Sequence, residues 1–207
     1  MLGRNHILFN LSTFFPLLFY LYLINYPLIY IYASFLCIIA FSNFPDIDIK
    51  YRRGKILNRI IYLIFYFPFI ILAFILKNKR MIKHRGITHT VYGLILFSFI
   101  VSLIYFSISF YLPSIFDFLI LFSIIFSYIL HLLCDLITAE GIVLTKRRFK
   151  GILITGKNDS IYTYIYSFFQ IISTFILYRI NFLLIPTIAF LILISFILIP
   201  LTIKNLK

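Results

Sequence analysis

The chain has 207 residues, of which 63% are hydrophobic and only 12% are charged. A soluble domain is typically about half apolar and about a quarter charged, so this composition excludes an ordinary soluble protein and indicates one embedded in a bilayer. The net charge of +13 would suggest nucleic-acid binding in a soluble protein. Here the basic residues lie in short segments between apolar runs, where they fix membrane topology and contact anionic headgroups, so we expect membrane lipid and no nucleic acid as partner.

Several apolar runs are long enough to cross a bilayer, which takes about 20 residues. Turns are expected at Asn25-Tyr26-Pro27, Tyr111-Leu112-Pro113 and Arg179-Ile180-Asn181, since proline and polar residues interrupt the runs there. The sequence predicts an all-α, multi-pass protein of the cell (inner) membrane, with a single transmembrane domain over residues 1–207. Its six expected spans lie near 7–24, 27–43, 87–110, 114–137, 160–178 and 182–202.

The apolar block 56–76 is long enough to be a seventh span, but basic residues flank it on both sides. A crossing would place one basic cluster outside, against the tendency of Lys and Arg to stay on the cytoplasmic side. We therefore predict a re-entrant or interfacial helical hairpin, broken at Pro68 and covered by other helices. In this six-span topology all 19 Lys and Arg residues except Arg179 share one side, the expected cytoplasmic one.

The most distinctive stretch is His84-Arg85-Gly86-Ile87-Thr88-His89-Thr90. Gly86 permits a turn, and Thr88 is a suitable N-cap for the apolar helix that follows. His89 is then expected in the first helical turn and His84 just before it. Free N–H groups at a helix start suit an oxyanion, and Arg85 with Thr88 would stabilise one. A basic, capped helix start explains Thr88 and Arg85, but not two histidines at this spacing.

Other candidate ligands occur at three further places. His131 and Asp135 are four residues apart and share one helical face, where an ionised carboxylate in a lipid-embedded helix requires compensation. Asp46 and Asp48 point the same way in an extended segment. The alternative for His131 and Asp135 is a stabilising pair that lines a water-filled cavity, and the alternative for Asp46 and Asp48 is an Asx turn. His6, at the mouth of the first span, is the third candidate, although a histidine there is often merely interfacial. Glu140, at a helix end, is a possible acid or base.

The six-span topology brings these groups to one membrane face, whereas a seven-span topology would separate Asp46 from His84 by about 30 Å. Histidine and carboxylate ligands suit a divalent metal, most readily zinc, with manganese or iron as alternatives. The number of ligands allows one or two ions, and two ions would suit phosphoester hydrolysis. The predicted metal ligands are His6, Asp46, Asp48, His84, His89, His131 and Asp135.

These motifs, in this order, resemble the DUF457 family of inner-membrane proteins, called membrane-bound metal-dependent hydrolases, which includes the YdjM-like proteins. The family pattern is an N-terminal histidine, P-D-x-D, H-R-G-x-T-H-S and H-x-x-x-D, and it covers about residues 1–150 here. This chain has Thr90 for the usual serine, a longer apolar insert after Asp48, and Lys146-Arg147-Arg148 where a Trp-Pro pair is common. A looser likeness to helical zinc phospholipase C and P1 nuclease favours phosphoesters.

The sequence therefore predicts a membrane-embedded, metal-dependent hydrolase acting on a phosphoester of a lipid or lipid-linked substrate at the cytoplasmic leaflet. Arg85 and Thr88 would stabilise the oxyanion, and Glu140 or a non-ligating aspartate would serve as base. One alternative is a metal-ion or proton transporter, because intramembrane histidine and aspartate also mark ion paths. Another is a non-catalytic membrane scaffold.

Overall fold

The computed structural model describes residues 3–47, 56–76, 86–112, 117–138, 142–143, 148–149 and 158–202. The long helices of this part are α1 (Gly3–Leu23), α2 (Leu28–Phe41), α4 (Ile56–Ile75), α5 (Val91–Tyr111), α6 (Phe118–Leu136), α7 (Asp159–Ile180) and α8 (Ile185–Thr202). The 3₁₀ turns η2 (Ile87–His89) and η4 (Phe182–Leu184) precede α5 and α8. Between α6 and α7, β1 (Ile142–Val143) pairs antiparallel with β2 (Arg148–Phe149).

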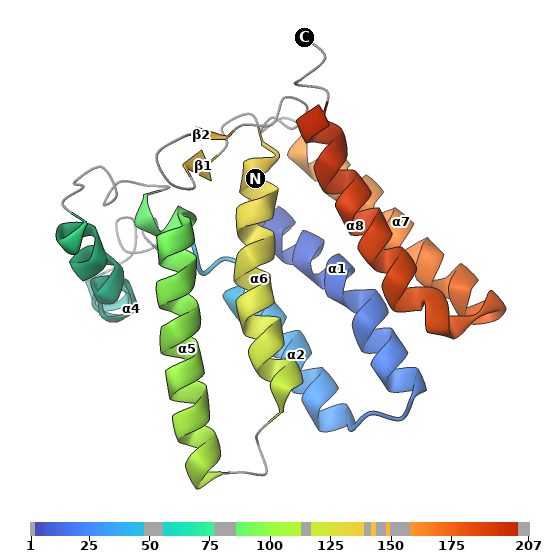
Figure 1. Ribbon diagram of the computed structural model, residues 1–207, viewed down its shortest axis with the longest axis horizontal. Helices are drawn as coiled ribbons and strands as arrows, with labels where there is room; N and C mark the ends of the chain where they lie inside the picture. The colour runs from blue at the N-terminus through green and yellow to red at the C-terminus, as the bar shows by residue number, and fades with distance from the viewer. Residues whose placement is uncertain are drawn as a thin grey trace.

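The helices α1, α2, α5, α6, α7 and α8 run up and down in alternation (Figure 1). The start of α1, the end of α2, the start of α5 and the end of α6 consequently meet at one end of the bundle, which is also where α8 ends. Among the described helices, α1, α5, α6 and α7 are long and apolar enough to cross a membrane. The predicted all-α, multi-pass architecture is confirmed, and each expected span corresponds to one of these six helices.

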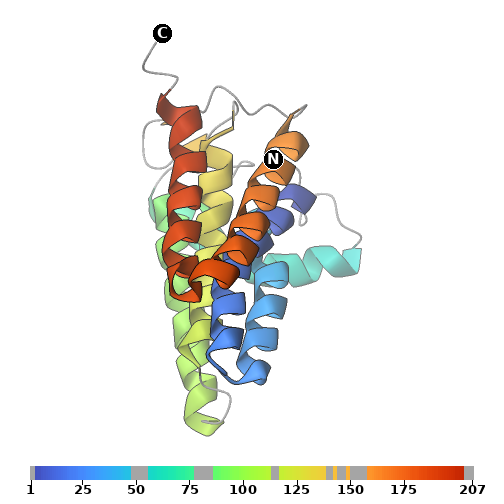
Figure 2. The same cartoon turned by 90° about the vertical axis from the view of Figure 1, so that its right-hand side faces the viewer.

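The block 56–76 forms one continuous helix, α4, with Pro68 inside it. The predicted hairpin broken at Pro68 is therefore wrong. A proline removes a single helical hydrogen bond and can bend a helix without ending it. The start of α4 (cyan) runs crosswise to the other helices, beside the bundle (Figure 2). Because α4 does not run along the bundle, the end of α2 and the start of α5 lie at the same end of it.

The turns at the opposite end of the bundle follow local chemistry. Asn25 adopts a positive φ of 59°, a left-handed conformation that asparagine tolerates better than most residues, and Pro27 precedes the first turn of α2. Asp117 caps α6 by accepting a hydrogen bond from Leu119 N at 2.7 Å. The Tyr26 hydroxyl also donates to Asp117 and so ties the two turns together.

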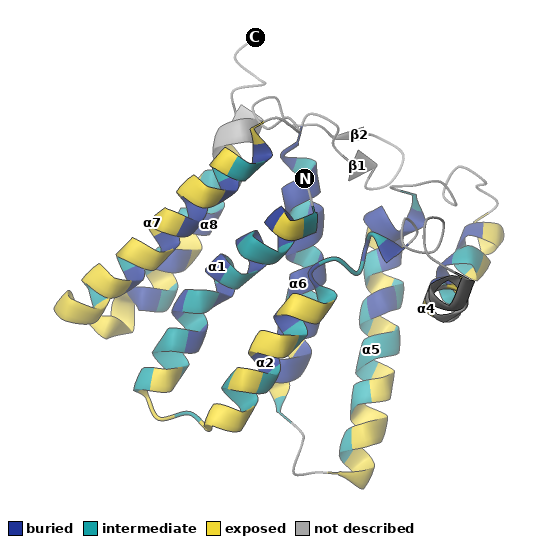
Figure 3. Cartoon of the chain, turned by 180° about the vertical axis from the view of Figure 1, so that it is seen from behind, coloured by how far each residue is buried: buried dark blue, intermediate teal, exposed yellow. Residues whose placement is uncertain are grey.

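Helix α6 lies at the centre of the bundle and α5 at its edge. In their most apolar stretches, 61% of the residues of α6 are buried, compared with 11% of those of α5. Figure 3 shows the exposed residues of α5 concentrated toward its C-terminal end. Two clusters of large side chains pack around α6, one against α4 and α5 and the other against α1 and α8. A polar group carried by α6 is therefore held in a packed, low-dielectric environment.

Candidate metal centre

Helix α6 carries two of the predicted ligands on one face. His131 and Asp135 are both buried, and His131 Nε2 lies 3.6 Å from Asp135 Oδ2. On the other side of the ring, His131 Nδ1 lies 2.7 Å from the carbonyl oxygen of Ser42. A carbonyl can only accept, so Nδ1 carries a proton, and Nε2 is the ring nitrogen that faces the carboxylate. A backbone or carboxylate partner commonly orients a metal-binding imidazole in this way.

His89 reaches the same place from η2, the turn before α5, rather than from the first turn of the helix as predicted. The N-cap of α5 is Thr90 and not Thr88: Thr90 Oγ1 accepts a hydrogen bond from Gly93 N at 3.2 Å. Thr88 Oγ1 instead lies 3.1 Å from His89 Nδ1. The hydroxyl of Thr88 thus faces the back of the imidazole, where it can hold the ring in place.

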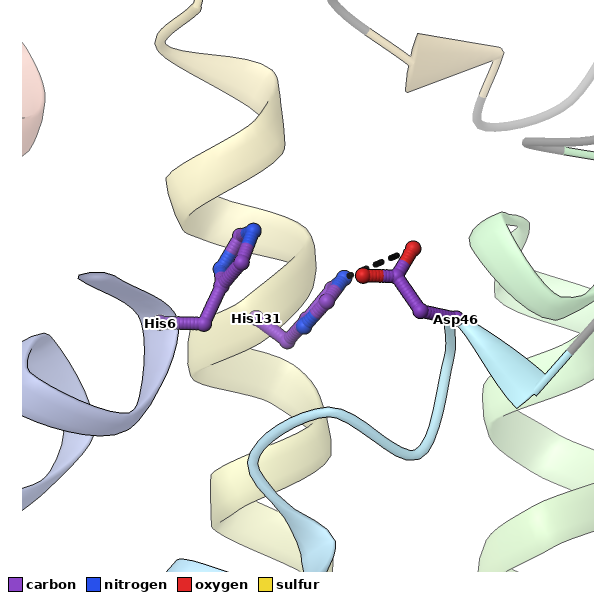
Figure 4. A group of neighbouring side chains, drawn as sticks. All are labelled: His6, Asp46 and His131. Carbon is purple, nitrogen blue, oxygen red and sulfur yellow. Dashed lines mark ion pairs between the residues drawn. The ribbon is translucent and has the colours of Figure 1, made fainter. Parts of the chain in front are cut away.

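The remaining described ligands come from α1 and from the turn after α2. His6 Nε2 lies 3.5 Å from Asp135 Oδ1, and its ring stacks on His131 with centroids 3.8 Å apart. Asp46 Oδ1 lies 3.4 Å from His89 Nε2 and 4.0 Å from His131 Nε2. Figure 4 shows His6 from α1, His131 from α6 and Asp46 from the turn after α2 converging, with the His131–Asp46 pair marked.

Three of the four nitrogen-to-oxygen distances in this cluster are those expected of ligands around one ion. They are 3.3 Å from His89 Nε2 to Asp135 Oδ2, 3.4 Å from His89 Nε2 to Asp46 Oδ1, and 3.6 Å from His131 Nε2 to Asp135 Oδ2, whereas His131 Nε2 and Asp46 Oδ1 are 4.0 Å apart. Ligands at about 2.0–2.2 Å from a tetrahedral ion are themselves about 3.3–3.6 Å apart. A direct N–H···O hydrogen bond is usually shorter, at about 2.7–3.2 Å.

Burial makes this arrangement costly unless something compensates it. Asp135 is 1% exposed and Asp46 is 19% exposed, while buried His131 Nε2 makes no hydrogen bond with any residue in the described part of the chain. Burial alone would raise the pKa of Asp46, but the neighbouring His89 and His131 lower it well below its usual value. Burial likewise opposes protonation of His89, yet the carboxylates of Asp135 and Asp46 raise its pKa to about 9.

Five of the predicted site residues are thus brought together: His6, Asp46, His89, His131 and Asp135. Asp48, His84, Arg85 and Glu140 lie outside the described residues. The sequence did not reveal the supporting residues Ser42 and Asn10. Ser42 acts through its backbone carbonyl, which every residue has, so its side-chain type does not indicate the role. Asn10 donates from Nδ2 to Ser42 Oγ and to Ser127 O, at 3.0 Å each. A buried amide in the first span was the available signal.

The chain matches the model of the family described as YdjM inner membrane protein over residues 1–204. It belongs to this family. The YdjM match covers almost the whole chain, beyond the 1–150 on which the motif resemblance rested, and it makes this a multi-pass protein of the inner membrane. No curated protein and no solved structure matches the chain.

Replacing Thr90 by alanine tests the capped turn that carries His89. The variant loses the acceptor for Gly93 N and the donor to Ile87 O at 2.7 Å, so we expect the free energy of unfolding to fall by about 1 kcal/mol. The measurement is unfolding in detergent, followed by circular dichroism. Ser107→Ala removes an exposed hydroxyl that donates to Leu103 O in the same helix and should have little effect. Equal losses in both variants would contradict the capping role.

Proposed function

We propose that the chain binds a divalent metal at the His6–Asp46–His89–His131–Asp135 cluster and uses it to hydrolyse a phosphoester of a membrane lipid or lipid-linked substrate. The observation that carries the proposal is the convergence of His89 and His131 with Asp46 and Asp135, whose facing nitrogen and oxygen atoms are 3.3–4.0 Å apart. These ligands suit zinc best, with manganese and iron as alternatives. When bound, such an ion polarises a phosphoryl oxygen and supplies an activated water near neutral pH.

The described residues favour one ion over two. His131 belongs to both groups of ligands that lie within 4.8 Å of one another, His6–Asp46–His131 and His89–His131–Asp135. Its Nδ1 is engaged by Ser42, so only Nε2 can bind metal, and it serves a single ion. The carboxylates of Asp46 and Asp135 together balance the charge of one divalent cation. Asp135 Oδ1, directed at His6, would form part of a second site only with ligands from outside the described residues.

The protein side chains have distinct roles in this proposal. Ser42 and Thr88 orient the imidazoles of His131 and His89. The packed surroundings of α6 bury His89, His131 and Asp135, which strengthens the electrostatic interaction of these residues with a bound substrate. Arg85 remains our candidate for stabilising the oxyanion, and Glu140 or a non-ligating aspartate remains the candidate base.

Transport is the weaker alternative. Polar side chains do continue through the depth of the bundle between α1 and α7, where Ser12 Oγ donates to Ser167 Oγ at 2.6 Å and Thr13 contacts the Tyr166 hydroxyl at 2.8 Å. These groups bond to one another across the interface, as polar residues do when they hold membrane helices together. A path for an ion would instead require ligands that face an open passage.

Chelation and restoration of the metal test the proposal. Protein purified in detergent should contain at least one equivalent of zinc, manganese or iron by elemental analysis. It should release phosphate or headgroup from phosphatidic acid or a phosphodiester lipid, lose this turnover with chelator, and regain it with added metal. His131→Ala, purified in parallel, controls for a contaminating enzyme. Protein without metal, or turnover that is unaffected by chelation and by His131→Ala, would refute the proposal.

A further inference from the structure

An apolar groove lies between α2, α4, α5 and α6, beside the metal centre. Its volume is about 490 Å³, within the range of about 300–1,000 Å³ that is common for ligand pockets. Its walls are aromatic and aliphatic side chains, and the hydroxyl of Tyr105, at its edge, is already bonded to the backbone of Asp117. The groove therefore offers an apolar ligand a large contact surface and few hydrogen-bonding groups.

The groove and the metal centre share a wall. Phe44 lines the groove and begins the tight turn that carries Asp46, in which Ile47 N donates to Phe44 O at 3.0 Å. Phe97 packs on Phe44 with centroids 4.7 Å apart and on Tyr128 with centroids 4.5 Å apart. The Tyr128 hydroxyl donates to the carbonyl of Thr88 at 2.5 Å, next to His89. One end of the groove thus lies against the residues that hold two metal ligands.

From that end the groove follows α5 into the bundle. Phe97, Val101, Ile104 and Ile108 all line it, and their spacing places them on one helical face. At roughly 1.5 Å per residue they extend along about 16 Å of the helix axis. Ile104 is 52% exposed, so the groove opens sideways onto the surface that would contact lipid. Its shape is long, apolar and laterally accessible, which fits a hydrocarbon chain.

We infer that this groove holds the hydrocarbon chain of the substrate, a membrane lipid whose phosphoester headgroup lies at the metal centre. This inference rests on the proposed function and adds to it the place where the protein binds the hydrocarbon chain of its lipid substrate. The choice of occupant follows from continuity, because a chain in the groove brings its polar end to Asp46 and His89. A smaller cavity of about 360 Å³, lined by Thr13, Phe122 and Pro186 among others, has no such shared wall.

Neighbouring residues of α5 provide a matched pair of variants. Ile104→Trp fills the groove, whereas Leu103→Trp adds the same bulk to a side chain that does not line it and is 58% exposed. Both positions are at the surface, so both variants should fold. With dioleoyl phosphatidic acid as probe, Ile104→Trp should lower kcat/KM by at least about tenfold. Leu103→Trp should leave it unchanged, and turnover of dibutyryl phosphatidic acid should be unchanged in both.

A binding measurement separates this inference from the hydrolase proposal. Phosphatidic acid with a photoreactive diazirine in its acyl chain should label the α5 segment 97–108, and unlabelled dioleoyl phosphatidic acid should compete where dioleoylglycerol does not. Competed labelling without turnover would support binding of the hydrocarbon chain in the groove and refute the proposed hydrolysis. Turnover that is unaffected by Ile104→Trp and by chain length would support hydrolysis and refute binding of the chain in the groove. Labelling spread equally over α7 and α8, or competed equally by dioleoylglycerol, would show only bulk lipid and overturn the inference.

Discussion

Asp135→Asn should abolish both the metal-induced stabilisation of the protein and its turnover of phosphoesters. Asp135 is the shared partner of the cluster, with Oδ2 at 3.3 Å from His89 and 3.6 Å from His131, and Oδ1 at 3.5 Å from His6. Metal at about 1,000 times its dissociation constant stabilises a folded protein by about 4 kcal/mol, so wild-type protein should unfold at a clearly higher temperature with metal than with chelator. The variant should show no such difference.

The metal dependence of the stability change distinguishes a metal ligand from a purely structural salt bridge. Without metal, Asp135→Asn removes a carboxylate that stabilises the protonated form of buried His89, so the chelated variant should be less stable than the chelated wild type. A purely structural ion pair predicts the same loss with and without metal, whereas a metal ligand predicts a larger loss when metal is present. Asp117→Asn, at the other end of the same helix, keeps a capping side chain and should respond to metal as the wild type does.

Gly93→Ala should destabilise the protein and weaken metal binding, although Gly93 is not itself a candidate ligand. A Cβ built at Gly93 would lie 2.1 Å from the carbonyl oxygen of Ile87 and 3.1 Å from Thr88 Cα. Both are backbone atoms of the turn that carries His89, so the turn must move away from α5. We expect a loss in the free energy of unfolding at or above the upper end of the about 1–3 kcal/mol typical of overpacking. Metal affinity should fall with it, because His89 moves away from Asp46, His131 and Asp135.

The control for this variant is Gly3→Ala. The nearest atom to a Cβ at Gly3 is Asn43 Nδ2 at 3.3 Å, in a side chain that can shift by a few tenths of an ångström. Metal titration by calorimetry and unfolding in detergent measure the two expected losses separately. Wild-type metal affinity and stability in Gly93→Ala would show that Gly93 of α5 and Ile87 of η2 are not in close contact.

The sequence by itself determined the bilayer environment, the helices and the end of the bundle at which the candidate metal ligands lie. Long apolar runs must form helices in lipid because every backbone polar group needs an internal partner, and the positions of Pro27 and Asn181 divided those runs correctly. The placement of basic residues indicated that 56–76 does not separate Asp46 from the histidines that follow. The 3.4 Å separation of His89 and Asp46 agrees with that prediction.

Only the tertiary structure decided the details that depend on contacts between distant segments. Threonine is a good cap at position 88 or 90, and the choice of Thr90 follows from Thr88 facing His89. Pro68 bends or breaks a helix according to what packs around it, and here α4 continues through it. The tautomer of His131 depends on the Ser42 carbonyl 89 positions away. A periodic pattern reports which face a residue occupies, whereas the partner across the interface is set by how the helices pack.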